Sequence, residues 1–373
     1  MPPWLAFFSM LQLVLSINAF AQDVITDCDK YAADALDPQR NATGVNFRNL
    51  NVLEAYPACE DAVRKYPSSM RLAYQLGRIY EKANKLTNAA QQYRRAADQN
   101  YAAAQLALGL LYARGAGIPR DIQQYISWAR KAADQGYAAA QDALGYAYLD
   151  GQGVPTDVRE AATWFRKAAE QGYASAQYKL GFMYQSGDGV AKDDFQAVAW
   201  FRKAADQGYS PAQDRLGFIY LNGVGVPTDA AQAVAWFRKA ADLGNASSQY
   251  RLGFLYQNGE GVPQDDQLAL MWYRKAGDQG YPLAQYSLGV MYANGMGVAQ
   301  DDQQAVAWYR KAADQGLADA RYSLGLAYEN GRGVPQDNAQ AIAWFRKAAD
   351  QGVKAARTKL DDLESLQNAQ ERR

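Results

Sequence analysis

The sequence predicts an all-α protein of stacked helix-turn-helix repeats, an α-solenoid. The first observation is a fixed period, because seven of the eight tryptophans lie 36 residues apart, at positions 128, 164, 200, 236, 272, 308 and 344. The second is that glycines, an aspartate and apolar residues recur in the same phase. A period of roughly 20–50 residues is typical of proteins in which each unit packs on its neighbours. One elongated domain can therefore account for 373 residues.

The unit that starts at Ala174 shows how one repeat is expected to fold. Apolar residues follow at helical spacing and the pattern stops at Gly187, which suits the left-handed residue after a helix. After a loop, Asp193 is placed to cap a second helix, which has Trp200 on its apolar stripe and stops at Gly208. Six of the seven repeats have Gln or Glu three residues after this aspartate, the pattern of a capping box.

Three further sets of residues in the same phase are interpreted as packing. A helical pair such as Leu144-Gly145 predicts that the backbone of the next helix passes close by, because an interior glycine costs about 1 kcal/mol. The tyrosine three residues later is expected to fill the space between repeats. The tryptophans are interpreted as core or half-buried, with a carbohydrate-stacking ladder as the alternative.

Pairs such as Arg130-Lys131 predict a balanced face with acids such as Asp134, and a basic stripe is the alternative.

The composition argues against several classes of function. The chain has no histidine, which excludes a Ser-His-Asp or Cys-His catalytic arrangement and mixed Cys/His metal sites. The 39 Lys and Arg residues balance 39 Asp and Glu residues, so binding to nucleic acid or to an anionic membrane is not expected. The G-x-G motifs follow helices instead of strands and are interpreted as turns, not as nucleotide sites. We expect no catalytic residue, no metal and no cofactor.

The first 21 residues are interpreted as a secretory signal peptide. Leu5 to Leu15 is an apolar stretch, and Ala19-Phe20-Ala21 fits a cleavage site, so cleavage is expected after Ala21. No Lys or Arg precedes the apolar stretch, and an uncleaved membrane anchor is the alternative, although the stretch is short for a membrane span. We therefore expect an exported protein, periplasmic or secreted, without stable membrane insertion after cleavage.

The sequence after the signal peptide divides into four regions. They are an N-terminal cap region at 22–66, a shorter repeat at 68–101, seven full repeats at 102–352, and a polar C-terminal capping helix and tail at 353–373. Cys28 and Cys59 are the two cysteines, and both lie in the cap region. In an oxidising compartment such a pair is expected to form a disulfide. The alternative, a redox-active thiol, lacks a C-x-x-C motif.

The repeat motif, A-x-A-Q-x-x-L-G-x-x-Y-x-x-G-x-G-V-P-x-D-x-x-x-A-x-x-W-F-R-K-A-A-D-Q-G, resembles the Sel1-like repeat, a relative of the tetratricopeptide repeat. The resemblance covers residues 102–352. It implies a right-handed α-solenoid that acts as a non-catalytic scaffold for protein–protein contacts, often in bacterial envelope assembly, signalling or host interaction. Some cysteine-rich exported relatives bind penicillin or resemble β-lactamases, so a cell-wall-related binding protein or hydrolase is the alternative. Those relatives have a cysteine pair in each repeat, which this chain lacks.

The same resemblance implies where a partner would bind. In tetratricopeptide-type arrays the first helix of each repeat lines the concave face. By this analogy the partner-binding aromatic residues are Tyr146, Tyr178, Phe182, Phe218, Tyr250, Phe254, Tyr286 and Tyr322, followed by Asn222, Asn258, Asn294 and Asn330. Rings supply apolar area and amides can bond a peptide backbone, so a monomer that binds a protein or extended peptide is expected. The alternatives are that the asparagines end their helices and that the phenylalanines pack on the preceding repeat.

Overall fold

The computed structural model describes residues 24–40 and 42–371, and their regular structure is helical. The one β pairing within these ranges is an isolated bridge between Asp34 and Val45. The all-α class and the repeated helix pairs are therefore confirmed. None of the helices in this part of the chain is long and apolar enough to cross a membrane. The predicted signal peptide, residues 1–21, lies outside the described residues.

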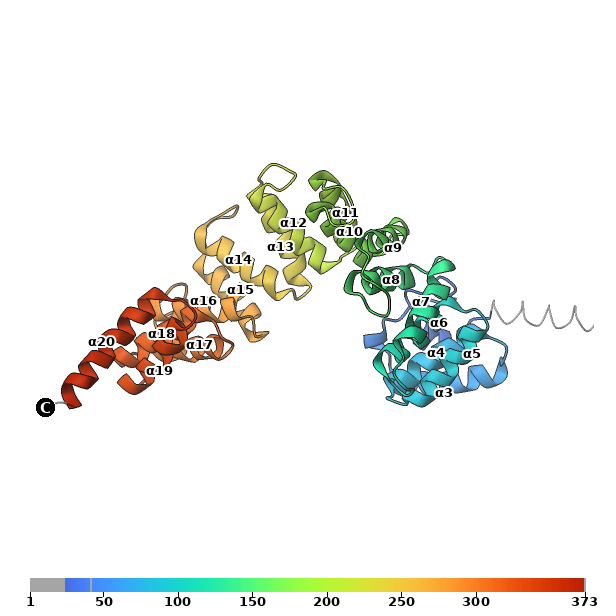
Figure 1. Cartoon of the computed structure of the whole chain (residues 1–373), viewed down its shortest axis with the longest axis horizontal. Helices are drawn as coiled ribbons and strands as arrows, with labels where there is room; N and C mark the ends of the chain where they lie inside the picture. Colours follow the sequence, from blue (N-terminus) through green and yellow to red (C-terminus); the bar gives the residue numbers. More distant parts are fainter. Residues whose placement is uncertain (1–23, 41, 372–373) are drawn as a thin grey trace, which may run out of the picture. The chain divides into compact units, whose positions relative to one another are not determined.

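The first of two compact units ends at Asp193. It begins with α2 and a short 3-10 helix, η1, and continues with α3 and a series of helix pairs (Figure 1). Its elements are α2 (Asp27–Ala32), η1 (Phe47–Asn49), α3 (Val52–Lys65), α4 (Met70–Lys82), α5 (Leu86–Asp98), α6 (Ala102–Arg114), α7 (Ile122–Asp134), α8 (Ala138–Asp150), α9 (Val158–Glu170) and α10 (Ala174–Ser186). Within this unit α4, α6 and α8 each pack on the second helix that follows, and α6, α8 and α10 each pack on the second helix that precedes them.

The second unit begins at Asp194 and repeats the same arrangement. Its elements are α11 (Asp194–Asp206), α12 (Ser210–Asn222), α13 (Ala230–Asp242), α14 (Ala246–Asn258), α15 (Asp266–Asp278), α16 (Pro282–Asn294), α17 (Asp302–Asp314), α18 (Ala318–Asn330), α19 (Asn338–Ala349) and α20 (Lys354–Glu371). The last helix packs on α19 through Ala356, Leu360 and Leu363, which are all buried. It therefore takes the place that a further first helix would occupy.

The predicted helix ends are present at the expected residues. The carboxylate of Asp157 accepts the backbone N–H groups of Arg159 and Glu160, both at 3.0 Å, and so caps the start of α9. The glycine after α8, Gly151, has a φ of 70°, a left-handed conformation that few other residues adopt. The capping-box prediction is only half fulfilled at Asp229, where the Gln232 amide donates to the aspartate side chain instead of returning to its backbone.

At most of the helical glycines the close approach is made by an aromatic ring and not by the predicted backbone, whereas at Gly109 the nearest atom is the Tyr125 carbonyl oxygen. A β-carbon on Gly145 would lie 2.7 Å from the Phe165 ring of the second helix. The same holds for Gly253, where the distance to the Tyr273 ring would be 2.6 Å. Each aromatic ring lies flat in the space that the absent side chain leaves, and Phe165 is fully buried there.

The tryptophans are core or half-buried packing residues, as the spacing predicted. Trp164 is 7% exposed, and the Lys167 ammonium lies 4.0 Å from its ring centre. Arg166 donates to the Tyr184 hydroxyl at 3.2 Å, which joins the second helix to the next first helix. The prediction that these basic residues pair with acids in their own helix is therefore replaced by contacts with Trp and Tyr.

The N-terminal region contains the predicted disulfide. Cys28 in α2 is bonded to Cys59 in α3, and both residues are fully buried. Helices α2 and α3 both contact α4, so the crosslink fixes the start of the chain against the first repeat. Closing a loop of 31 residues contributes about 3–4 kcal/mol in the chain-entropy model.

Candidate functional site

The candidate site is the first-helix face, defined as the positions two residues before and two residues after each repeat leucine. In the first unit, the half-buried Tyr146 meets Phe165 edge to face, with ring centres 5.1 Å apart. Lys179 lies 5.0 Å from the Tyr146 ring. Tyr178 and Phe182 contact each other at 4.9 Å. These rings are therefore partly used in packing and partly exposed.

The second unit has the longer run of aromatic residues on this face. Tyr250, Tyr286 and Tyr322 are half-buried, and each packs on the aromatic ring of its own second helix at 5.7–5.8 Å. Phe254 is 45% exposed. Phe218 is half-buried and lies beside Arg251, whose guanidinium is 5.5 Å from the ring. The structure thus brings these predicted residues onto one side of successive first helices, where they are partly exposed.

The four asparagines have a local role at the helix ends. The side-chain amide of each donates to the backbone carbonyl four residues earlier, at 2.8–2.9 Å. All four side chains are exposed at the last residue of their helix, and a left-handed glycine follows. Helix termination therefore accounts for the amide N–H₂ groups, and the predicted role in binding a peptide backbone stays a prediction for the amide oxygens.

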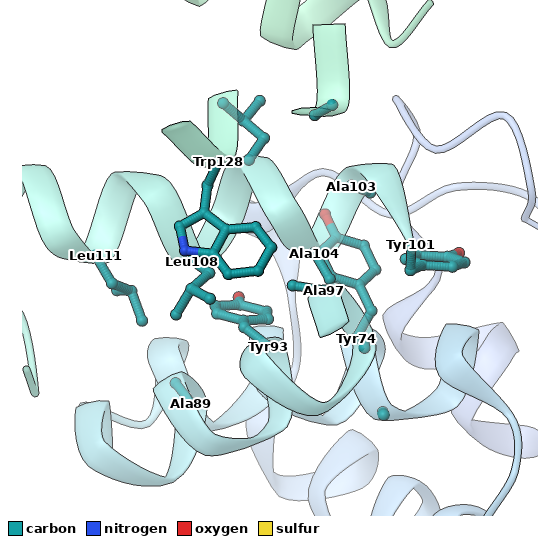
Figure 2. Packing of buried hydrophobic residues seen from close by; sticks show 14 of the residues in the cluster. Tyr74, Ala89, Tyr93, Ala97, Tyr101, Ala103, Ala104, Leu108, Leu111 and Trp128 are labelled. Carbon is teal, nitrogen blue, oxygen red and sulfur yellow. The ribbon is translucent and has the colours of Figure 1, made fainter. Parts of the chain in front are cut away.

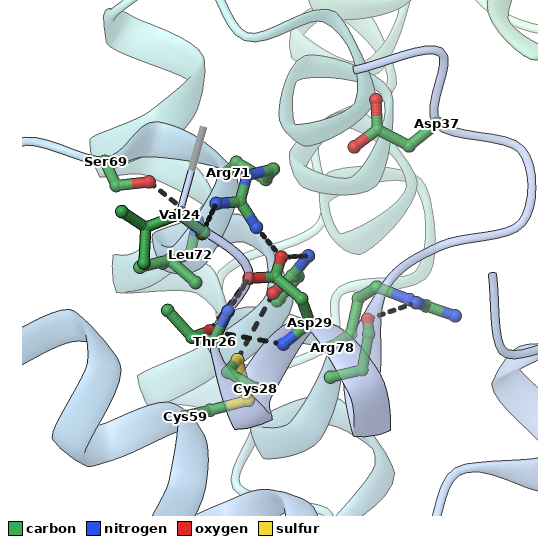
Figure 3. A network of polar contacts seen from close by, with 12 residues as sticks. Val24, Thr26, Cys28, Asp29, Asp37, Cys59, Ser69, Arg71, Leu72 and Arg78 are labelled. Atoms are coloured by element: carbon green, nitrogen blue, oxygen red, sulfur yellow. Dashed lines mark hydrogen bonds and ion pairs between the residues drawn. A yellow bond between two sulfur atoms is a disulfide. The ribbon is translucent and has the colours of Figure 1, made fainter. Parts of the chain in front are cut away.

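At α4 the first-helix face is covered by the chain's own N-terminal region, which the sequence analysis missed. Asp29 is fully buried and forms an ion pair with Arg71, and it accepts the Gln75 amide at 3.0 Å (Figure 3). Arg78 donates to the carbonyls of Ala32 and Val45, at 2.6 and 2.9 Å. Polar side chains of α4 thus hold an irregular segment against a helix.

Residues 34–37, which we call the acidic segment, contact Tyr74 on this face and Tyr101, the residue before α6. The Tyr74 hydroxyl donates to the Asp34 carboxylate, and the Tyr101 hydroxyl donates to the Asp37 carboxylate. Tyr74 and Tyr101 are only 4% and 6% exposed, and Asp37 is 2% exposed. Burial raises the pKa of Asp37, while the Tyr101 hydrogen bond acts in the opposite direction.

A cavity of about 420 Å³ lies beside the acidic segment, and Asp34, Tyr137 and Asp142 are among the residues that line it. Asp142 is 8% exposed and accepts the Ser175 hydroxyl at 3.3 Å. Burial raises the pKa of this carboxyl to about 7, with Ser175 and Lys179 opposing the shift. The equivalent residue in the second unit, Asp214, instead accepts the Ser248 hydroxyl at 2.6 Å and lies 3.8 Å from Arg251.

A recurring tyrosine could have indicated part of this arrangement. The residue before each first helix is tyrosine at positions 101, 137, 173, 209 and 281. Its ring packs against a tyrosine of the first-helix face in two pairs, Tyr101 with Tyr74 and Tyr281 with Tyr250. The described residues contain no group of three or more His, Cys, Asp or Glu side chains that could hold a metal ion.

Comparisons with known proteins identify the repeats. The Sel1 repeat model matches seven consecutive segments, 102–137, 138–173, 174–209, 210–245, 246–281, 282–317 and 318–353. A search of curated proteins gives no match. A protective antigen of uropathogenic Escherichia coli with an SLR fold is 37% identical, covers 84% of this chain and 67% of its own, and superposes with a TM-score of 0.72.

A second solved structure, a Sel1 repeat protein from Oxalobacter formigenes, is 35% identical, covers 84% of this chain and 92% of its own, and has a TM-score of 0.62. Proteins built from such repeats generally serve as scaffolds for protein interaction and are typically non-catalytic. The chain belongs to the Sel1 repeat family.

Proposed function

We propose that the protein is an exported, non-catalytic scaffold that binds an extended segment of a partner protein along the first-helix face. The observation on which this rests is the aromatic run of the second unit, where Tyr250, Tyr286 and Tyr322 are half-buried and Phe254 is 45% exposed. Packing on the second-helix ring leaves each of these tyrosines partly exposed. Rigid aromatic side chains of this kind are enriched among the residues that dominate binding energy at interfaces.

The exported location rests on the signal-like residues 1–21 and on the disulfide between Cys28 and Cys59. The Escherichia coli relative is described as a protective antigen, which is consistent with a location outside the cytoplasm. An envelope role in signalling, assembly or host interaction is part of this proposal. The hydrolase alternative has no support among the described residues, and we do not propose it.

A photo-crosslinking amino acid tests the binding face. It is placed at Phe254, and the control places it at Phe195, which is 77% exposed on α11 of the same unit. We expect crosslinks to a partner in the native envelope from position 254 only, and we expect Tyr250→Ala/Tyr286→Ala to abolish them while circular dichroism stays unchanged. Equal crosslinking from both positions, or full crosslinking by the double variant, would contradict the proposal.

A further inference from the structure

The acidic segment shows what the first-helix face binds when it is occupied. Tyr74 lies between two other rings, 5.7 Å from Tyr93 and 5.6 Å from Tyr101 (Figure 2). Asp34 and Asp37 accept the hydroxyls of the outer-facing pair, Tyr74 and Tyr101. Two carboxylates at positions i and i+3 of an irregular segment thus match two tyrosines of one repeat.

The first set consists of Tyr74, Tyr93 and Tyr101. In one other repeat the three corresponding positions are also all tyrosine, namely Tyr250, Tyr273 and Tyr281, which form the second set. Tyr250 lies 5.7 Å from Tyr273 and 5.4 Å from Tyr281, and the ring planes meet at 38° and 40°, against 38° and 43° in the N-terminal set. The hydroxyl of the second-helix tyrosine also forms an equivalent hydrogen bond in the two sets. Tyr93 donates to Glu81 and Tyr273 donates to Gln257, both at 2.8 Å.

The two sets differ in what covers them. Tyr74 and Tyr101 are buried beneath the acidic segment, whereas Tyr250 and Tyr281 are half-buried and their hydroxyls form no hydrogen bond with any described residue. The residue two positions after Tyr101 is Ala103, which is 4% exposed. The corresponding residue after Tyr281 is Leu283, which is 38% exposed. The second set therefore has the ring geometry of the covered set, and no described residue of its own unit accepts a hydrogen bond from its two outer hydroxyls.

The charge near the second set favours an anion. Arg251 takes the position of Gln75 on the first helix, and its Nε is buried without a hydrogen bond. Its guanidinium is 3.8 Å from Asp214, a longer separation than a hydrogen-bonded ion pair has. A tyrosine hydroxyl is a protonated donor at neutral pH, and burial raises the pKa of Tyr250 further. Two hydroxyl donors and one incompletely paired cation thus lie on the same surface.

We propose that the Tyr250–Tyr281 set binds an extended acidic segment of a different protein, with two carboxylates at positions i and i+3, as Asp34 and Asp37 are placed in this chain. This inference rests on the proposed function and specifies the partner's chemistry. A second copy is not the expected occupant, because Cys28–Cys59 holds each copy's N-terminal region in place and Asp37 is already buried within its own chain.

A peptide with the sequence of residues 31–39, YAADALDPQ, blocked at both ends and fluorescently labelled, is the probe. Its binding to the full mature chain is measured by anisotropy. The control peptide has both aspartates replaced by asparagine. We expect the acidic peptide to bind at least tenfold more tightly than the control, and added salt to weaken it.

Conservative variants locate the site. Tyr250→Phe/Tyr281→Phe removes two hydroxyls and keeps the rings, and it is expected to weaken peptide binding at least tenfold. Tyr328→Phe removes a hydroxyl that accepts from Arg310 and lies outside the first-helix face, and it is expected to change binding less than twofold. Arg251→Gln restores the residue found at position 75 and is expected to reduce the salt dependence.

Three results would overturn the inference. They are equal binding of the two peptides, full binding by the Tyr250→Phe/Tyr281→Phe variant, and attachment of a photoreactive peptide to α4 or α6 instead of α14 or α16. Dimerisation of the free chain that this variant abolishes would also overturn it, because the occupant would then be a second copy. If the peptide fails but crosslinking from position 254 persists, the proposed function stands and only the acidic partner is wrong.

Discussion

The same three tyrosines occur at two places in the chain and have different surroundings. Around Tyr74 the first-helix face is closed by a segment that a disulfide and two buried arginines hold down. Around Tyr250 the rings pack alike but the face is open. The difference shows that the repeat framework positions the rings without help from an occupant. Coverage at α4 is a property of the N-terminal region and not of the repeat.

The largest expected effect concerns the polar contacts that close the N-terminal face. Asp29→Ala leaves Arg71 buried without its carboxylate, which is expected to cost about 3–5 kcal/mol. The matched change, Asp214→Ala, removes a partly exposed partner of Arg251 and the acceptor of the buried Ser248 hydroxyl, and is expected to cost about 1–2 kcal/mol. Amide hydrogen exchange of α4 and α14 measures both. Equal loss of protection in the two helices would contradict the comparison.

A pH-dependent effect is expected at Asp142. The folded pKa of Asp142 is about 7, above the unfolded value of about 4, so its stability contribution is fully present below pH 4 and is lost as pH rises to 7. Asp142→Asn should therefore stabilise α8 at pH 8 by up to about 4 kcal/mol and have little effect near pH 4. Exchange protection factors across this range are the measurement. A gain that does not vary with pH would show that the carboxyl does not titrate as expected.

The smallest effect tests whether the ring contact sets the tyrosine geometry. A methyl group at Gly253 would lie 2.6 Å from the Tyr273 ring, so Gly253→Ala is expected to destabilise the repeat by about 1–3 kcal/mol despite the better helix propensity of alanine. At Gly109, where Ala129 replaces the ring, the nearest atom would be the Tyr125 carbonyl oxygen at 3.2 Å, and Gly109→Ala is expected to cost less than Gly253→Ala. Thermal unfolding of the two variants compares them. An unchanged midpoint for Gly253→Ala would show that the ring moves aside freely.

Most of the fold follows from local signals. The caps, the left-handed glycines and the amphipathic stripes each lie within a few residues of the feature that they determine, so Asp157 and Gly151 could be interpreted from sequence alone. The fit of an aromatic ring over a helical glycine could not, because it depends on the register between two helices. The same limit explains why Arg166 was expected to find an acid in its own helix, whereas it reaches Tyr184 in the next helix.

The candidate site was predictable only in part. The analogy with tetratricopeptide arrays gave positions on one side of each first helix, and the structure places Tyr250, Tyr286 and Tyr322 there as open, half-buried rings. Coverage of α4 by residues 34–37 could not be predicted, because the N-terminal region has no repeat phase to align with the array. The sequence also contains no signal that the carboxyl of Asp142, two residues before Leu144, would be buried beside a cavity.

Arg166 donates to Tyr184, and the same Arg–Tyr hydrogen bond recurs in other repeats. Each of these bonds connects a second helix to the first helix that follows it. Such a joint is the same wherever it occurs, so a gene can gain or lose one whole repeat without needing a new type of joint. The binding surface then changes length in discrete steps, and the number of contact points offered to a long partner changes with it. Avidity could be tuned by copy number instead of by substitution.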